Sequence, residues 1–383
     1  MKRISIDPAA RVATVEAGTL WGELDSATQA FGLATTGGVV SHTGVSGLTL
    51  GGGIGWLMRR HGLTVDNLLA ADVIGADGQQ LAADADEEPD LFWGLRGGGG
   101  GLGVVTSFTY RLHPVGPDVL AGPVIWSLDD APEVLHAYAR YVGSAPREAA
   151  TVVTLRRAPT APSLPGDLHG RPVCIISMLA IGDPQRAEQL LAPLRRCGRP
   201  LVDLVRYRPY TNLQSMFDAV VPHGWHYYWK STGLSDLDSG TIETLTEQSA
   251  RARSPRSYAI LFHLGGAVAD ADPAATAYSR RHITHELNVN AVWLPHETIG
   301  DAERAWARTF IERLPSGRSG DGAYVNFLDS DDHHRRPTAF APGAHARLTR
   351  LQERFDPDYV FAPGPPLRPG PDSTTTPDTV LRR

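Results

Sequence analysis

Glycine is concentrated in two loops within the first hundred residues. One loop runs from Gly37 to Gly55 with the sequence GGVVSHTGVSGLTLGGGIG, and the other carries five consecutive glycines at 97–101. A backbone N–H beside a residue without Cβ can approach a phosphate group closely, so such loops can bind a nucleotide. The same glycines could equally form the turns of a crowded sheet, and the loops alone favour neither interpretation.

Two nucleotide-binding motifs can be tested against the second loop. Gly98-x-Gly100-x-x-Gly103 satisfies the dinucleotide fingerprint literally, but that fingerprint should follow a strand and open a helix. Here the glycines follow a predicted helix at 86–95 and precede a predicted strand at 103–112. No Gly-Lys-Ser/Thr ending is present either. The sequence therefore excludes a Rossmann-type NAD site and a nucleotide-hydrolysing P-loop at this position.

Histidine, aromatic and acidic residues cluster further along the chain. The run HGWHYYWKS at 223–231 could line a cleft with its rings or pack as an ordinary strand. The pairs His223/His226 and His333/His334 lack further partners in a recognisable metal-ligand pattern, so we expect solvated histidines there. The acidic run at 329–332 predicts a solvated turn.

The elements that must position the glycine loops are short. Residues 4–17 predict strand, turn and strand because apolar and polar residues alternate, and residues 67–83 predict two further strands. Thr19 is predicted as the N-cap of a helix. Gly22 occupies the position where a capping box needs Glu or Gln, so only the N-cap half of that motif is present. We expect no packed helix in 37–55, because glycine has no side chain to bury and a high entropy cost.

The composition changes near residue 117, and the middle of the chain mixes strands with amphipathic helices. This pattern predicts helices over a mostly antiparallel sheet. A further segment begins near residue 321, and its Pro/Thr-rich tail is expected to be disordered. The predicted strands are 173–180, 227–232, 258–268, 289–294 and 324–328, and the predicted helices are 131–142, 184–196, 302–313 and 344–355.

Whole-chain composition excludes several classes of protein. The 383 residues carry 36 Lys+Arg and 42 Asp+Glu, a net charge of −6 that argues against a nucleic-acid partner. Two cysteines, Cys174 and Cys197, cannot form a disulfide framework. No apolar run approaches the roughly 18 residues that span a bilayer, and the N-terminus lacks the apolar core of a secretory signal. We therefore expect a soluble, cytoplasmic, two-domain protein without a membrane partner.

Four segments near the two ends of the chain can be compared with known families. They are GGVVSHTGVSGLTLGGGIGWLMRRHGLTVDNLLAADVIGADG at 37–78, DLFWGLRGGGGGLGVVTSFTYRLHPV at 90–115, AYVNFLDSDD at 323–332 and RLTRLQERFDPDYVF at 347–361. Together they resemble the berberine-bridge-enzyme-like (BBE-like) FAD-linked oxidases of the vanillyl-alcohol-oxidase type. The resemblance covers most of residues 1–361 and is strongest over 3–117.

This resemblance implies an α+β fold in which both chain ends form a PCMH-type FAD-binding domain. An antiparallel-sheet substrate domain would be inserted between the two ends, in agreement with the composition shifts near 117 and 321. The expected division is 1–117 for the FAD-binding domain, 118–320 for the substrate domain, 321–362 for the returning C-terminal segment and 363–383 for the tail.

The resemblance also implies how the residues would work. Tyr324 matches a Tyr-x-Asn motif whose tyrosine is the catalytic base in several family members, and Asn326 would bind the flavin or orient that tyrosine. A base role requires the phenol pKa, ordinarily near 10, to shift downward, or a concerted proton transfer. A purely structural tyrosine remains the alternative. Backbone contacts to FAD are implied at Gly37, Gly38, Ser41, Thr43, Gly44, Gly47, Gly51 and Gly52, with Asn67, Gly103 and Val105 further on.

The implied reaction passes a hydride from a hydroxyl-bearing or activated carbon of a small molecule to flavin N5. Molecular oxygen would then reoxidise the flavin and give hydrogen peroxide.

The chain departs from the family at its covalent anchors. The family's flavin-linked histidine lies before the position of Ile4, and its second anchor, a cysteine, aligns with Val40. We therefore expect FAD to be held noncovalently. Gly101-Leu102-Gly103 replaces the family's Asn-Phe-Gly, and 362–365 replaces an Asn-rich segment. The alternative hypothesis is a truncated, catalytically inactive remnant of a flavin fold.

Overall fold

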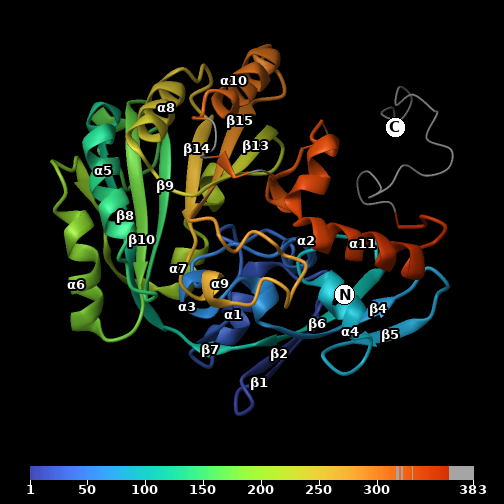
Figure 1. Cartoon of the computed structure of the whole chain (residues 1–383). Helices are drawn as coiled ribbons and strands as arrows, with labels where there is room; N and C mark the ends of the chain where they lie inside the picture. Colours follow the sequence, from blue (N-terminus) through green and yellow to red (C-terminus); the bar gives the residue numbers. More distant parts are fainter. Residues whose placement is uncertain (316–318, 321, 330, 362–383) are drawn as a thin grey trace.

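Two antiparallel sheets with flanking helices form the body of the protein (Figure 1). The computed structural model describes residues 1–315, 319–320, 322–329 and 331–361. Within those ranges, no helix has the length and apolar character needed to cross a membrane. The predicted mixture of helices with antiparallel sheets is confirmed.

The smaller sheet is built from the first 111 residues, in the strand order β1-β2-β6-β4-β5. Its residues alternate as predicted: Ala13 and Val15 are fully buried, while Thr14 between them is exposed. The strands are β1 (Ile4–Asp7), β2 (Val12–Glu16), β4 (Leu68–Ile74), β5 (Gln80–Ala83) and β6 (Val104–Arg111), and a small separate pair is β3 (Leu33–Ala34) with β7 (His113–Pro114).

Helix α1 (Trp21–Gln29) begins one residue later than predicted. Leu20, not Thr19, occupies the cap position, and its N–H donates to the Glu23 carboxylate at 2.8 Å. The acidic half of a capping box therefore holds this terminus, although the cap residue itself has no polar side chain.

The glycine-rich stretch does contain a helix, so the expectation for 37–55 is wrong at its centre. Helix α2 (Val45–Gly51) buries Val45 and Thr49, and the Thr49 hydroxyl lies 2.7 Å from the Tyr110 hydroxyl of β6. Small side chains allow this short helix to lie close to the sheet, and the packing between them offsets the entropy cost of glycine. Helices α3 (Met58–His61) and α4 (Pro89–Leu95) complete this half.

The larger sheet has nine strands, and all of its pairs are antiparallel. The order is β11-β8-β10-β9-β14-β15-β13-β16, with β12 also paired to β8. The predicted strand 258–268 is too long, because Gly265 and Gly266 turn the chain with positive φ after β14 ends. The strands are β8 (Asp118–Ser127), β9 (Ala149–Arg157), β10 (Pro172–Ala180), β11 (Val202–Asp203), β12 (Arg206–Pro209), β13 (His226–Leu234), β14 (Tyr258–His263), β15 (His285–Trp293) and β16 (Ser319–Gly320).

The two faces of the larger sheet pack against different parts of the chain. One face packs under four amphipathic helices, α5 (Ala131–Val142), α6 (Pro184–Arg195), α8 (Ser239–Ala250) and α10 (Gly300–Glu312), which form the outer layer in Figure 1. The opposite face packs against side chains from the first half of the chain, including Ile54, Trp56 and Leu57. The short helices α7 (Tyr210–Gln214) and α9 (Ala267–Asp270) lie near this junction (Figure 1).

The C-terminal segment returns to the smaller sheet. Helix α11 (Pro342–Phe355) lies beside α4 (Figure 1), and its Leu348 and Leu351 share a core with Leu91 and Phe92. The predicted strand at 324–328 is wrong: residues Val325–Phe327 form a 3₁₀ turn. A second 3₁₀ segment spans His333–Ala339, and the predicted tail lies outside the described residues.

Candidate active site

A cavity of about 720 Å³ lies at the junction of the two halves of the chain. Four segments form its walls: the glycine loop at 38–48, the inner face of strands β9, β13, β14 and β15, the loop at 217–225, and the turn at 324–327. Residues from distant parts of the sequence therefore meet around one space.

Part of the predicted cofactor set forms the glycine wall of this cavity. Gly38, Thr43, Gly44 and Gly47 all line it. A Cβ added at Gly44 or Gly47 would meet no atom within 4 Å, so the backbone at these positions borders open space. A ligand can approach this backbone without meeting a side chain, which is the arrangement that phosphate or ring contacts to main-chain groups require.

Other predicted glycines lie behind this wall and do not line the cavity. Gly37 packs against the ring of Trp21, a Cβ at Gly51 would collide with the Asn326 amide, and Gly52 has a φ of +131°. Ser41 is held by Asp218, which accepts hydrogen bonds from its N–H and hydroxyl at 2.8 and 2.5 Å. These residues set the path of the loop.

Asn67, Gly103 and Val105 also lie away from the lining of the cavity. Asn67 donates to the carbonyls of His61 and Leu63 at 3.0 and 2.8 Å and so ties a loop together. Gly103 has a φ of +144° at the start of β6, and the Val105 side chain is buried in the core of the smaller sheet.

Tyr324 lies at the edge of the cavity with its phenol oxygen held by two donors. The N–H of Gly53 donates to it at 2.7 Å and the Asn326 side-chain amide at 2.9 Å. The same Asn326 amide also donates to the Leu48 carbonyl at 3.1 Å. The contact between Tyr324 and Asn326 thus arises from a 3₁₀ turn and not from a shared strand face.

The pKa of Tyr324 shifts in the direction opposite to the one a base needs. Burial raises the pKa above its usual value, and the hydrogen bonds from Gly53 and Asn326 counter this effect only in part. Because both neighbours donate, the phenol proton is free to be donated to an acceptor in the cavity.

The aromatic run at 223–231 both lines the cavity and packs as a strand. Both interpretations hold because neighbouring side chains on a strand point to opposite faces. Tyr227 and Trp229 line the cavity. Tyr228 and Lys230 point the other way, and both donate to Asp331, at 2.6 and 2.5 Å.

The acidic run at 329–332 agrees only in part with the predicted solvated turn, because Asp331 is exposed in a turn but Asp332 is buried. The Lys230 ammonium is nearly buried and pairs with both Asp331 and Asp332. Partial burial raises the pKa of Asp331, but hydrogen bonds from Lys230, Tyr228 and Arg308 hold that pKa well below its usual range. The run therefore fastens the segment that follows Tyr324 to β13.

Thr154, Trp229 and Asn288 each bring a buried polar side-chain atom to the cavity wall with no hydrogen-bond partner among the described residues. Trp229 belongs to the run that was expected to line a cleft, whereas Thr154 and Asn288 were missed at the sequence level. Arg156 lines the same wall. Strand periodicity could have grouped Thr154 with Arg156, but the sequence does not say which face meets the glycine loop.

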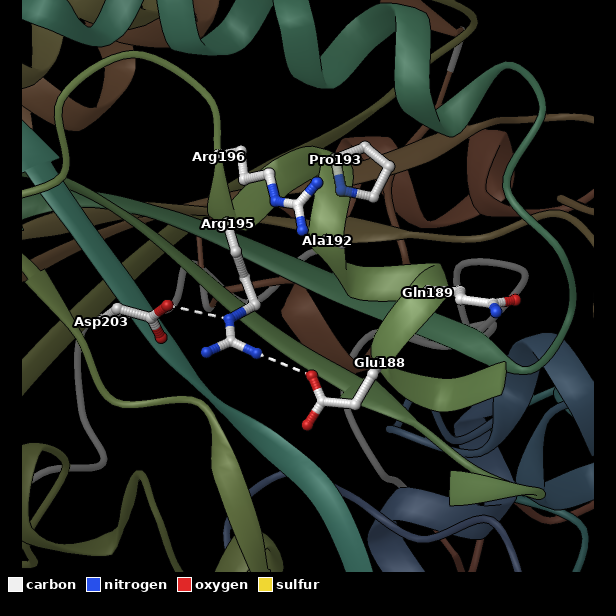
Figure 2. A pocket seen from close by; sticks show the side chains of 7 residues that line it. All are labelled: Glu188, Gln189, Ala192, Pro193, Arg195, Arg196 and Asp203. Carbon is white, nitrogen blue, oxygen red and sulfur yellow. Dashed lines mark hydrogen bonds and ion pairs between the residues drawn. The ribbon is translucent and has the colours of Figure 1, made fainter. Parts of the chain in front are cut away.

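Two further hollows lie among the described residues, and the second of them is lined by the predicted residue Ser41. The hollow on α6, shown in Figure 2, measures about 680 Å³. Its Arg195 extends between Asp203 and Glu188 and pairs with them at 2.8 and 2.9 Å, so these charges satisfy one another. A hollow of about 620 Å³ between α1 and α7 includes the buried Asp25.

Comparison with known proteins identifies the family. A model described as FAD binding domain matches residues 1–84, which include the whole glycine wall. An FAD-linked oxidoreductase of Pyricularia oryzae, OXR1, is 30% identical over 385 residues, which cover 94% of this chain and 72% of the relative. The chain belongs to the FAD-linked oxidoreductases.

Solved structures agree with this placement of the FAD-linked oxidoreductase chain. It matches 6-hydroxy-D-nicotine oxidase from Arthrobacter nicotinovorans with a TM-score of 0.79 and 22% identity, covering 94% of this chain and 78% of that one. It matches BBE-like 1 of Physcomitrella patens with a TM-score of 0.81 and 20% identity, covering 94% and 78%. The predicted resemblance to BBE-like flavoproteins is confirmed, and the family is one of FAD-binding enzymes.

The residues of this FAD-linked oxidoreductase fit the cofactor that the family implies. Open backbone at Gly44 and Gly47 offers main-chain groups, and the facing sheet offers the Trp229 indole N–H, which has no partner among the described residues. Together they supply both donors and acceptors around a space of the size that small-molecule sites occupy.

Proposed function

We propose that this FAD-linked oxidoreductase oxidises a hydroxyl-bearing or otherwise activated carbon of a small molecule in the junction cavity. The observation that carries the proposal is the Tyr324 phenol, held by two N–H donors at the edge of that cavity, beside the glycine wall. When bound, FAD supplies the hydride acceptor at N5 and, by reaction with molecular oxygen, the route to hydrogen peroxide.

FAD is held noncovalently in this proposal. Main-chain groups of Gly38, Thr43, Gly44 and Gly47 form the binding wall, and the open approach at Gly44 and Gly47 supports this role. Val40, which lines the same wall, has a side chain that cannot bond covalently to the flavin.

Tyr324 acts on the reacting hydroxyl. Its protonated form donates to the substrate oxygen and orients it, because the phenol oxygen already accepts from Gly53 and Asn326. Its ionised form accepts the substrate proton, and the same two donors stabilise the negative charge on the phenol oxygen.

In this proposal the chain divides into a flavin-binding part around the smaller sheet and a substrate part around the larger sheet. Residues 1–117 and 321–362 form the flavin-binding part, and residues 118–320 form the substrate part. The first strand of the larger sheet begins at Asp118, and α11 packs on α4, which supports this assignment.

Replacing Tyr324 with Phe tests the function. We expect the variant to keep its bound flavin, because the glycine wall is untouched, while kcat falls by about 10²- to 10⁴-fold. The visible flavin spectrum and steady-state turnover measure the two effects separately. A variant with full turnover would remove Tyr324 from the mechanism, and a wild-type protein that takes up no FAD would favour the inactive remnant.

A further inference from the structure

Arg156 brings a positive charge to the cavity without an internal counter-ion. Among the described residues that line the cavity it is the only arginine, and there is no lysine. Its guanidinium lies 5.2 Å from the centre of the Tyr258 ring, and its Nε donates to the Arg157 carbonyl at 3.1 Å. No carboxylate of the described part of the chain forms an ion pair with it.

An unpaired charge in this environment is costly. Burial lowers the pKa of Arg156, against the opposing effect of the Tyr258 and Tyr227 phenols. A cation that has lost much of its hydration and has no carboxylate partner within the described ranges gains most from an anion that enters the same space.

Neutral polar groups surround Arg156 on the same face of the sheet. Strand register places Arg156 and Asn290 on either side of Tyr258, and places Thr154 and Asn288 on either side of Ile260. Thr154 and Asn288 are each 3% exposed, and each has a side-chain oxygen without a partner in the described ranges. The Thr154 hydroxyl can donate to an anion, whereas the Asn288 amide oxygen can only accept. The single positive charge of Arg156, with neutral polar neighbours, can neutralise a monoanion such as a carboxylate. It would neutralise only half of the charge of a phosphate dianion.

This anion site lies at a distance from Tyr324. Tyr324 packs edge-on against Phe327 at 4.9 Å, and Phe327 stacks on Phe262 at 5.9 Å, both between ring centres. Phe262 is four residues along β14 from Tyr258, which corresponds to about 13 Å at the usual rise of a strand. Ile260, with Thr154 and Asn288 on either side of it, lines the cavity between Tyr258 and Phe262.

We infer that the substrate carries a carboxylate that pairs with Arg156, at the end remote from the carbon that is oxidised beside Tyr324. This inference rests on the proposed function and names its substrate class: an elongated aryl or alkyl carboxylic acid whose oxidisable group lies at the end remote from the carboxylate.

Calorimetric titration with matched acids and amides tests the inference. The probes are ω-phenyl carboxylates with two to six carbons in the acid chain, each paired with its uncharged amide, added to the purified protein as isolated. We expect at least one acid to bind at least about 10-fold more tightly than its amide. In Arg156→Met the affinity for that acid should fall by about 10- to 100-fold while the affinity for the amide stays within about 2-fold.

Two companion variants separate charge from fold. Arg156→Lys keeps the positive charge. On a logarithmic scale, it should recover at least half of the affinity for the acid that Arg156→Met loses. Arg157→Met removes a neighbouring positive charge from a residue outside the cavity lining and should leave the affinity for both probes unchanged. Equal affinity for acid and amide, loss of acid binding in Arg157→Met to the same degree, or no acid binding at all would overturn the inference.

The experiment also distinguishes this inference from the proposed function. A yellow protein that oxidises neutral alcohols and prefers no acid would retain the function and refute the carboxylate site. A colourless protein that still binds the acid through Arg156 would refute the function for this chain and support the anion site.

Discussion

Tyr324 keeps its phenol proton more firmly than a tyrosine in water does, because burial raises the pKa by disfavouring the phenolate. A base must lose that proton first, so the ionised fraction is small at neutral pH and grows as the pH rises. The two N–H donors to the phenol oxygen limit this penalty but do not reverse it. The residue is therefore suited to orient a hydroxyl at neutral pH and to accept its proton at alkaline pH.

The pH dependence of turnover should reflect the ionisation of Tyr324. We expect log kcat to rise with pH through about 7–10 without reaching a plateau, because the raised pKa of Tyr324 lies above its ordinary value near 10. Steady-state kinetics at saturating substrate measure the profile, with Tyr324→Phe as the control that should lose the rise. A plateau already present at neutral pH would assign the base role to another group.

At the scale of elements, the glycine wall offers bare backbone at Gly44 and Gly47. Gly47 lies on the short helix α2, and a Cβ there would enter open space, so a larger residue projects into the cavity without a clash in the protein itself. Filling that space should hinder the ligand more than the fold.

Gly47→Val should therefore weaken FAD binding by at least about 10-fold while the thermal midpoint of the flavin-free protein changes little. Gly343→Val is the matched control, because Gly343 also has an open Cβ position but is exposed on α11. Fluorescence titration with FAD compares the two. Equal flavin affinity in both variants would contradict the assignment of the wall.

The contact between α1 and α7 should depend on pH. Asp25 on α1 is 2% exposed and accepts a hydrogen bond from Gln214 on α7 at 2.9 Å. Burial raises its pKa to about 7, so the folded protein binds the proton more tightly than the unfolded chain. The resulting stabilisation is fully present below about pH 4 and is lost as the pH rises through about 7, by about 4 kcal/mol at most.

Asp25→Asn isolates this effect, since asparagine is neutral throughout. The difference in unfolding free energy, wild type minus variant, should fall as the pH rises from about 5 to about 8, and denaturant unfolding at both values measures it. A difference that does not change with pH would mean that Asp25 is charged in the folded protein.

At the scale of the whole molecule, the site exists because segments far apart in sequence meet at one junction. Alternation in 4–17 and the apolar run and turn in 67–83 predicted four strands of the smaller sheet, because these patterns are local. Amphipathic spacing likewise predicted three of the four outer helices, α5, α6 and α10, but not α8. The residues of the glycine wall and Tyr324 were predicted from the motifs that resemble the BBE-like family. Arg156, Thr154 and Asn288 could not be found in this way, since only the packing of the larger sheet against the first half of the chain decides which strand face lines the cavity.

The same reason explains the errors within the elements. The helix α2 in the glycine loop and the pairing of Asp331 with Lys230 both depend on partners 61 or 101 residues away. Glycine's low helix propensity opposes α2, and no local pattern indicates the ion pair, so tertiary contacts decide both outcomes.

The visible absorption spectrum of the purified protein, recorded before and after acid precipitation, tests the central claim most directly. We predict a yellow protein whose colour passes into the supernatant, because the glycine wall offers backbone contacts and Val40 offers no covalent anchor. Colour that stays in the pellet would contradict noncovalent binding. A colourless protein that cannot be reconstituted with FAD would contradict the proposed oxidation chemistry itself.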